Sequence, residues 1–165
     1  MTRVLLLSDS HGNVRNMMLA VEESKPDLIL HMGDCYKDAG ALQEEYPDIP
    51  MKRVLGNCDW DDGPAEELFE LEGKKIWICH GHAYCVKSSL LSLQYAAREK
   101  GADIVIFGHT HHLFYDAYDG LFVINPGSIG APPPGIPASY ALLTLEEEKK
   151  GLPTLETFYL NENEW

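Results

Sequence analysis

The stretch Val4-Leu5-Leu6-Leu7-Ser8-Asp9-Ser10-His11-Gly12 decides the fold class, because its run of apolar residues ends abruptly in polar ones. A short apolar run bounded by a turn is typical of a strand that is buried on both faces of a sheet. Apolar residues then recur at helical spacing over 14–21, and Asn13 can cap that helix. The stretch therefore predicts a strand, a polar turn and a helix, which is the first unit of an α/β fold.

The same succession recurs further along the chain. Strands are predicted over 28–30, 53–55, 75–79 and 104–107, and helices over 39–46 and 88–100. Residues 60–66 are acidic and rich in turn formers, which predicts a loop. Beyond residue 112 apolar and polar residues alternate, which predicts antiparallel strands over 113–118, 121–124, 140–145 and 154–160. The expected fold is an α/β sandwich of two packed sheets flanked by helices, parallel in its first half and antiparallel in its second.

Length and composition indicate one domain spanning residues 1–165. Hydrophobic residues make up 45% of the chain and charged residues 24%, which is typical of a soluble globular protein. No apolar stretch approaches the roughly 20 residues of a membrane span, and no targeting segment is recognised, so we expect a cytoplasmic location and no membrane partner. Cys35, Cys58, Cys79 and Cys85 show neither metal-binding nor disulfide spacing and are expected to be reduced thiols.

The net charge of −13 limits the classes of partner. Such a surface repels nucleic-acid backbones, which argues against binding to a long duplex. Bound divalent cations would nevertheless dominate the field inside a cleft and allow a small phosphorylated substrate to bind there. The sequence leaves the oligomeric state open between a monomer and a homo-oligomer.

Side chains that can bind metals stand at five strand ends: Asp9 and His11, Asp34, Asn57, His80, and His109 with His111. Ligands bind at the carboxyl ends of the strands in sheets that contain parallel pairs. Two metal ions about 3.5–4 Å apart can clamp the attacking and leaving oxygens of a phosphoryl transfer. Each motif is weak by itself, but their order, each after an apolar strand, predicts one dinuclear centre.

The motifs Asp9-Ser10-His11, Gly33-Asp34, Gly56-Asn57-Cys58-Asp59, His80 and Gly108-His109-Thr110-His111 resemble those of the calcineurin-like metallophosphoesterase superfamily. The short chain and the Gly-Asn-Cys-Asp variant resemble its small YfcE-type phosphodiesterase branch. The similarity extends from Asp9 to Asn125-Pro126-Gly127-Ser128, which is most of the chain. It implies a four-layer αββα sandwich in which two mixed β-sheets are flanked by helices.

The resemblance also implies a ligand set and a reaction. Around one metal it implies Asp9, His11, Asp34 and His111, and around the other it implies Asp34, Asn57, His80 and His109. Asp34 would bridge the two ions, and a hydroxide between them, its pKa lowered by both cations, would attack phosphorus. Oxygen and imidazole ligands together admit Mn²⁺, Ni²⁺, Fe²⁺, Co²⁺ or Zn²⁺, and we expect two divalent ions per chain with Mn²⁺ as the first choice.

Two departures from the family bear on catalysis. Many members have a histidine after the Gly-Asn pair that is thought to protonate the leaving group, whereas this chain has Cys58, a weak acid and a poor donor. The general acid is therefore open between Cys58, His82 and no residue at all, and His82 has the alternatives of binding phosphate or of facing solvent. Pro132-Pro133-Pro134 also stands where related sequences carry a basic residue, so one phosphate-binding cation is missing.

The residues expected to take part in catalysis are Asp34, Asn57, His82 and Cys58. His31 is expected in the core, and His112 is assigned no chemistry. Asp59 is either a turn residue or a group that orients a ligand from behind.

The expected function is a metal-dependent phosphodiesterase acting on small phosphoesters. A phosphomonoesterase is the alternative within the enzyme class. A non-catalytic scaffold like the related retromer subunit, which has lost part of its metal site, is the alternative outside that class, and a regulatory metal or nucleotide sensor is a third. All seven ligand positions hold competent residues here, which favours the enzyme.

Overall fold

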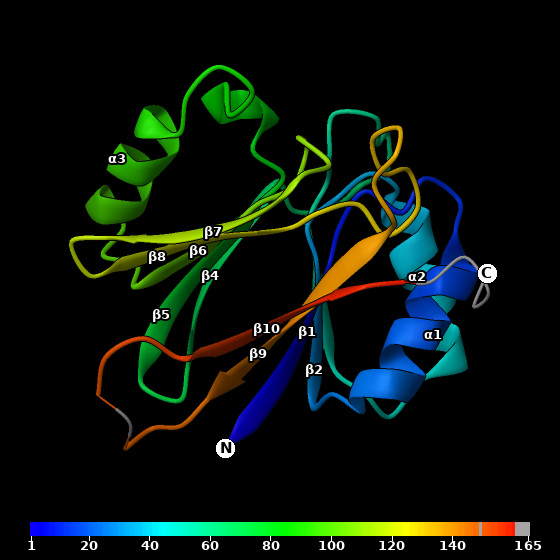
Figure 1. Ribbon diagram of the computed structural model, residues 1–165, viewed down its shortest axis with the longest axis horizontal. Helices are drawn as coiled ribbons and strands as arrows, with labels where there is room; N and C mark the ends of the chain where they lie inside the picture. Colours follow the sequence, from blue (N-terminus) through cyan, green and yellow to red (C-terminus); the bar gives the residue numbers. More distant parts are fainter. Residues whose placement is uncertain (149, 161–165) are drawn as a thin grey trace.

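In the computed structural model, which describes residues 1–148 and 150–160, two five-stranded sheets pack face to face (Figure 1). The first sheet, in the order β10-β9-β1-β2-β3, contains β1 (Thr2–Leu7), β2 (Leu28–His31), β3 (Met51–Arg53), β9 (Ser139–Leu145) and β10 (Thr154–Tyr159). The second, in the order β4-β5-β6-β8-β7, contains β4 (Glu66–Leu71), β5 (Lys74–Cys79), β6 (Ile104–Ile106), β7 (Leu113–Tyr118) and β8 (Leu121–Pro126).

Helices cover the outer face of each sheet. α1 (Val14–Ser24) and α2 (Tyr36–Glu45) lie on the first sheet, and α3 (Leu91–Glu99), preceded by the short 3-10 helix η1 (His82–Tyr84), lies on the second (Figure 1). The predicted four-layer αββα arrangement is confirmed. Among the described residues, no helix is both long and apolar enough to cross a membrane.

The apolar run that opens the chain is buried on both faces, as predicted. Val4 and Leu6 of β1 point into the core between the sheets, whereas Leu5 and Leu7 pack with Met17 of α1. A central parallel strand with covered faces has no polar side, which is why its sequence does not alternate. The side chain of Asn13 caps α1 as expected, because its Oδ1 accepts the backbone N–H of Asn16 at 3.0 Å.

The two mixed sheets that the family resemblance implies are confirmed, whereas the simple division into a parallel first half and an antiparallel second half was wrong. Each sheet is mixed: β1, β2 and β3 are parallel and β9 joins them antiparallel, while β5, β6 and β8 are parallel and β4 and β7 close the edges antiparallel. The crossover that places β8 beside β6 follows from tertiary packing and leaves no local signal in the sequence.

The strand β4 was not predicted. Its residues, Glu-Glu-Leu-Phe-Glu-Leu, follow the acidic stretch 60–66 that we interpreted as loop, and the loop ends one residue earlier than expected. At this edge only alternate positions meet the core, so Phe69 packs against it while Leu68 is 46% exposed. The third strand also lies earlier, at Met51–Arg53 instead of 53–55, and α3 begins three residues later than predicted.

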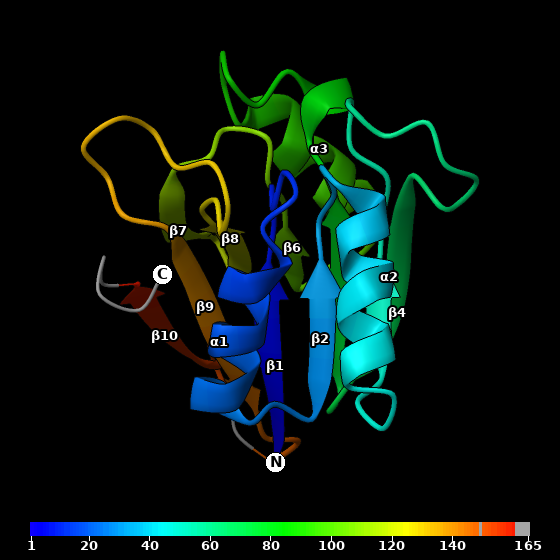
Figure 2. The ribbon, with the colours of Figure 1, turned by 90° about the vertical axis from the view of Figure 1, so that its right-hand side faces the viewer.

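The parallel strands bring their carboxyl ends to one edge of the sandwich. Figure 2 shows the turns after β1 and β2 at the same end of the molecule as the segment before α3. This end carries the predicted metal ligands.

Candidate metal centre

The predicted ligands come from strand ends in both sheets. Asp9 follows β1, Asp34 follows β2, His80 follows β5, and His109 and His111 follow β6. Backbone hydrogen bonds hold these ends together: the N–H of Asp9 donates to Gly33 O and the N–H of Gly108 donates to His80 O, both at 2.9 Å. The N–H of His109 donates to Oδ2 of Asp9 at 3.0 Å and thereby joins the two sheets.

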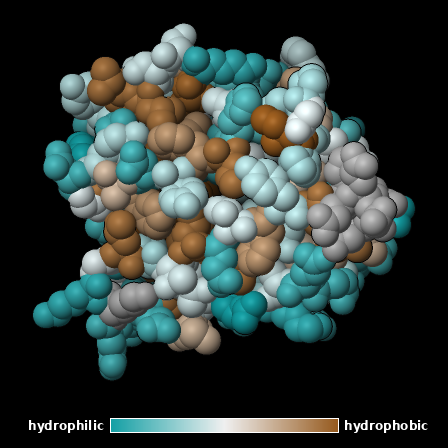
Figure 3. Space-filling model, viewed as in Figure 1, coloured by the Kyte–Doolittle hydropathy of each residue, from teal (hydrophilic) through white to brown (hydrophobic). Residues whose placement is uncertain are grey.

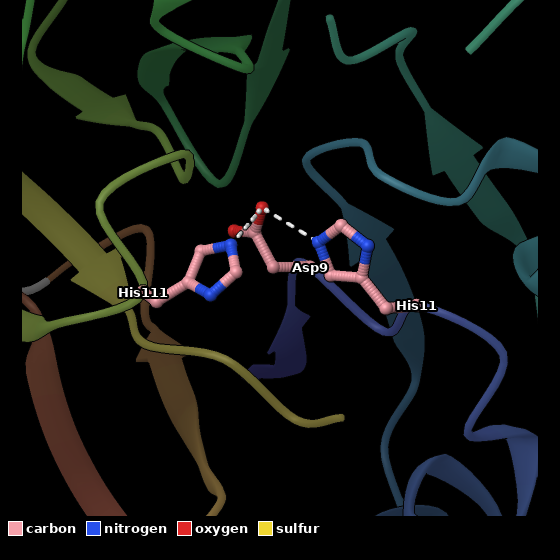
Figure 4. Close-up of side chains that lie close together, drawn as sticks. All are labelled: Asp9, His11 and His111. Atoms are coloured by element: carbon pink, nitrogen blue, oxygen red, sulfur yellow. Dashed lines mark ion pairs between the residues drawn. The ribbon is translucent and has the colours of Figure 1, made fainter. Parts of the chain in front are cut away.

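Five of the seven predicted ligands face one another at close range. Oδ1 of Asp9 lies 3.3 Å from Nε2 of His111, 3.7 Å from Nε2 of His80 and 3.9 Å from Nε2 of His11. Oδ2 of Asp34 lies 3.5 Å from Nε2 of His80 and 3.8 Å from Nε2 of His11. Figure 4 shows the Asp9 carboxylate between the imidazoles of His11 and His111. These separations exceed ordinary hydrogen-bond lengths but leave room for a cation about 2.0–2.2 Å from each atom.

Two groups of potential ligands result, Asp9 with His11 and His111, and Asp9 with Asp34 and His80. Asp9 therefore belongs to both groups, whereas the family resemblance assigned the shared position to Asp34. Oδ2 of Asp34 nevertheless faces both His11 and His80, one ligand from each predicted site.

The buried polar atoms of this cluster are better arranged to bind a metal ion than to form hydrogen bonds with one another. Oδ1 of Asp9 and Nε2 of His80 are buried and have no hydrogen-bond partner among the described residues. Nδ1 of His80 lies 2.7 Å from the carbonyl oxygen of Met32, and Nδ1 of His111 lies 2.7 Å from that of Ala131. Because a carbonyl accepts, each Nδ1 carries the proton and each Nε2 is free to bind a cation, the usual arrangement behind metal-bound histidines.

The electrostatics favour cations in the same place. Burial raises the pKa of Asp34, but its contact with His80 and the N–H of Cys58 outweigh burial and hold the pKa below its ordinary value. Burial likewise raises the pKa of Asp9, and contacts with His111 and His80 bring it below the ordinary value. Both carboxylates are therefore ionised at neutral pH. Their charges raise the pKa of His80 against the effect of burial, so a metal would compete with a proton for that imidazole.

The backbone at these positions is unusual. Asp9, His11, Asp34, His109 and His111 all have positive φ, between 42° and 70°, in a region that residues other than glycine seldom adopt. Such conformations cluster at functional sites, where the surrounding structure maintains them. Close approach also requires glycine nearby, since a Cβ on Gly56 would lie 2.0 Å from Oδ1 of Asp34.

The remaining predicted residues lie at the border of this cluster. The ring of His109 is 5.1 Å from that of His80, and the ring of His82 is 5.5 Å from it, both between centroids. Asn57 is exposed, and its Nδ2 lies 3.6 Å from Sγ of Cys58. The backbone N–H of Cys58 donates to Oδ1 of Asp34 at 2.9 Å, which places the exposed thiol beside the carboxylates. Burial and the carboxylate of Asp34 raise the pKa of this thiol, so it is a weaker acid than a free cysteine.

Asp59 connects the loops that carry the ligands. Its Oδ2 accepts the N–H of Gly56 at 2.8 Å and that of Asp34 at 3.1 Å, and its Oδ1 accepts the N–H of Tyr36 at 2.8 Å. Asp59 therefore combines the two roles that the sequence left open: it forms a turn, and it positions Asp34 through the backbone.

A buried network lies behind the centre. His31 is fully buried, as predicted, with its Nδ1 accepting the N–H of Gly33 and its Nε2 3.0 Å from Oγ of Ser10. That hydroxyl donates to Oδ2 of Asp38 at 2.8 Å, and Gly12 N–H donates to the same oxygen. The role of Asp38 was missed, because an acid in the first turn of a helix has an ordinary explanation in the helix dipole.

Comparison with known proteins places the chain in a family. Residues 2–148 match the calcineurin-like phosphoesterase superfamily domain. The chain is 38% identical to a probable metallophosphoesterase, YsnB, of Bacillus subtilis, over 88% of this chain and 85% of that protein. It is 25% identical to the phosphodiesterase YfcE of Escherichia coli, over 87% and 88% respectively.

The fold agrees with a solved structure as well. A predicted phosphoesterase from Streptococcus pneumoniae has 26% sequence identity and a TM-score of 0.76, with 95% of this chain and 98% of that one covered. The chain therefore belongs to the calcineurin-like phosphoesterase superfamily, and it is a hydrolase of phosphoester bonds that depends on divalent metal ions.

Proposed function

We propose that this protein is a phosphodiesterase that binds two divalent metal ions per chain, with Mn²⁺ as the first choice of metal. Its substrate is a small phosphoester. The observation that carries the proposal is the pair of buried atoms without partners, Oδ1 of Asp9 and Nε2 of His80, inside a cluster of ionised carboxylates and imidazoles. Asp9, His11, Asp34 and His111 would hold one ion, and Asp34, Asn57, His80 and His109 the other. The phosphodiesterase activity named for the relative in Escherichia coli supports the choice of diesters.

The bound ions would lower the pKa of a water molecule that they bind and would neutralise negative charge on the phosphate. The chain contributes the positions of the groups around them. Asp59 holds the backbone of Asp34 in place by accepting its N–H. The Nδ1–H groups of His80 and His111 donate to the carbonyl oxygens of Met32 and Ala131, and these hydrogen bonds fix the orientation of both rings.

Two further side chains act on the substrate in this proposal. His82 is an exposed residue, but partial burial of its ring and the neighbouring charge of His80 lower the pKa of its imidazole. The imidazole is therefore neutral at pH 7 and can donate an N–H to a phosphate oxygen. Cys58 stands where the leaving group departs, and its raised pKa makes it a poor proton donor. The leaving group therefore departs largely without protonation by the protein.

The experiment is a metal-by-substrate assay on protein stripped with a chelator. After reloading with Mn²⁺, Ni²⁺, Fe²⁺, Co²⁺ or Zn²⁺ in turn, we expect bis(4-nitrophenyl) phosphate to be hydrolysed faster than 4-nitrophenyl phosphate, and neither without metal. Faster hydrolysis of the monoester would favour a phosphomonoesterase. No hydrolysis with any metal would favour a protein-binding scaffold.

A further inference from the structure

An open cavity of about 420 Å³ lies beside the metal centre. Its walls are mainly apolar and are formed by Val86, Leu90, Phe107 and Phe114, and Thr110, Lys87 and the exposed His112 add polar groups. Figure 3 shows apolar side chains gathered over the side of the molecule where α3 and β7 lie. The cavity is lined there by the segment 86–90, which precedes α3, and by Phe114 of β7.

The cavity and the centre share two stretches of backbone. Gly81 stands between His80 and His82, and a Cβ placed on it would lie 3.1 Å from Cγ2 of Val86 and 3.4 Å from Cδ2 of Phe107. The cavity therefore begins directly behind the segment that carries these two histidines.

The second shared stretch is at Thr110, which stands between His109 and His111 and lines the cavity. Oγ1 of Thr110 accepts a hydrogen bond from Nδ2 of Asn125 at 2.9 Å and another from the N–H of His112. These bonds hold the side chain in place, so the wall common to the cavity and the centre is well defined.

The charge of the cavity suits an anionic substrate. Lys87 is the only Lys, Arg, Asp or Glu among its described lining residues, in a chain whose net charge is −13. Lys87, in the segment before α3, supplies a cation to the cavity, whereas the sequence has none at the proline stretch after Ser128.

We propose that this cavity is the subsite for the retained ester group of the substrate, that it takes an aromatic or branched apolar group, and that Lys87 pairs with the phosphodiester anion at its entrance. The inference rests on the proposed phosphodiesterase activity. The leaving group is assigned to the side of Cys58, because the backbone N–H of Cys58 donates to Oδ1 of Asp34 and Cys58 is not among the described lining residues of the cavity. The substrate class is therefore a phosphodiester that carries an apolar organic group.

Two diesters with the same leaving group test the subsite. 4-Nitrophenyl phenyl phosphate and 4-nitrophenyl methyl phosphate both release 4-nitrophenolate, so their comparison isolates the retained group. We expect the phenyl diester to have a kcat/KM about tenfold or more above that of the methyl diester, through a lower KM. Equal values would overturn the subsite while leaving the phosphodiesterase activity intact.

Filling the cavity should remove this preference. Leu90→Trp is expected to raise KM for the phenyl diester about tenfold and to leave the methyl diester nearly unchanged. Leu152→Trp makes the same change at an exposed leucine outside the cavity lining and should preserve the preference. Lys87→Ala should raise KM for both diesters, and Lys87→Arg should restore it. Equal losses for both diesters in Leu90→Trp would contradict the proposal.

A binding measurement decides the matter if no diester is hydrolysed or if Leu90→Trp does not fold. Phenylphosphonate and methylphosphonate are titrated into Zn²⁺-loaded wild-type protein, with backbone amide signals followed by NMR. We expect phenylphosphonate to shift the signals of Leu90 and Thr110 strongly, and methylphosphonate to shift those of His82 and His109 only. Binding of phenylphosphonate without a shift at Leu90 and Thr110 would overturn the subsite.

Discussion

Nε2 of His80 lies 3.7 Å from Oδ1 of Asp9, and neither of these buried atoms has a hydrogen-bond partner among the described residues. An unsatisfied buried polar atom costs on the order of 1–3 kcal/mol, and here two of them face each other. The carbonyl oxygen of Met32, 2.7 Å from Nδ1 of His80, holds the ring in the orientation that directs Nε2 at the carboxylate. A metal cation bound between the two atoms would satisfy both of them.

Asp34→Asn should lower hydrolysis of a phosphodiester by several orders of magnitude. The substitution removes a negative charge that faces His11 and His80 and that both proposed ions would share. Steady-state kinetics at saturating Mn²⁺ measure the effect. Asp116→Asn, on the exposed part of β7, is the matched control and should retain activity. Similar losses in the two variants would mean that Asp34 does not bind metal.

Asp59→Ala should weaken metal binding about 10–100-fold, as the loss of a group behind the ligands commonly does. The variant loses the acceptor for the N–H groups of Gly56, Asp34 and Tyr36, so the two loops that carry proposed ligands are no longer joined. Calorimetric titration with Mn²⁺ gives the affinity. Asp62→Ala, an exposed acid in the same loop, is the control. An unchanged affinity in Asp59→Ala would reduce Asp59 to a turn residue.

Hydrolysis rates should depend steeply on the leaving group, because Cys58 is a poor acid and general-acid assistance is typically worth about 10²–10⁴-fold. Aryl diesters should be cleaved much faster than alkyl diesters. Cys58→His should narrow the difference, and Cys58→Ala should barely change the aryl rates. The measurement is a series of diesters with graded leaving-group pKa.

A competing account gives the acid role to His82. In that case His82→Ala would selectively slow the alkyl diesters, whereas phosphate binding by His82 predicts equal losses for both classes. A flat dependence of the wild-type rate on leaving-group pKa would contradict our assignment of Cys58.

Stability should fall as the pH drops from neutral. Burial lowers the pKa of His31 to about 4, compared with about 6.5 in an unfolded chain. Between these values the unfolded chain binds more protons, so the stabilisation is complete above about pH 6.5 and is lost as the pH falls to about 4, by roughly 3 kcal/mol in all.

Urea unfolding in the presence of a chelator, at about pH 7 and about pH 5, measures this loss, of which roughly 2 kcal/mol should occur in that interval. His31→Gln cannot titrate and should show a correspondingly smaller difference between the two conditions. If wild type and variant lose the same stability, His31 is not the group responsible.

Most of the fold was predictable because its central strands are buried on both faces and end in polar turns. The runs at 4–7, 75–79 and 104–107 all became strands, with small changes at their ends. Strand order was not predictable, since the placement of β8 beside β6 depends on contacts between distant segments. The edge strand β4 was not predicted because it is rich in glutamate. Acidic residues are common in loops, and they are equally suited to the solvent-exposed face of an edge strand.

The site was predictable in its residue types but less so in its environment. The motifs at strand ends predicted seven metal ligands, because the carboxyl ends of the strands share one edge of the sandwich. The structure brings five of them together at close range: Asp9, His11, Asp34, His80 and His111. The contact of Asp38 with Ser10 and the proposed role of Lys87 were missed, because both arise only when chain segments far apart in sequence come together. No local pattern distinguishes either residue from an ordinary surface charge.

The most direct test of the central claim is the metal content of the purified protein. After saturation with Mn²⁺ and removal of free metal, elemental analysis should find two ions per chain, and a chelator should then abolish hydrolysis while circular dichroism shows a preserved fold. In this account Asp9 and Asp34 would supply the carboxylates for both ions, and because both are ionised at neutral pH, both ions should bind at that pH. A content of one ion per chain or less under saturating conditions would contradict the dinuclear centre.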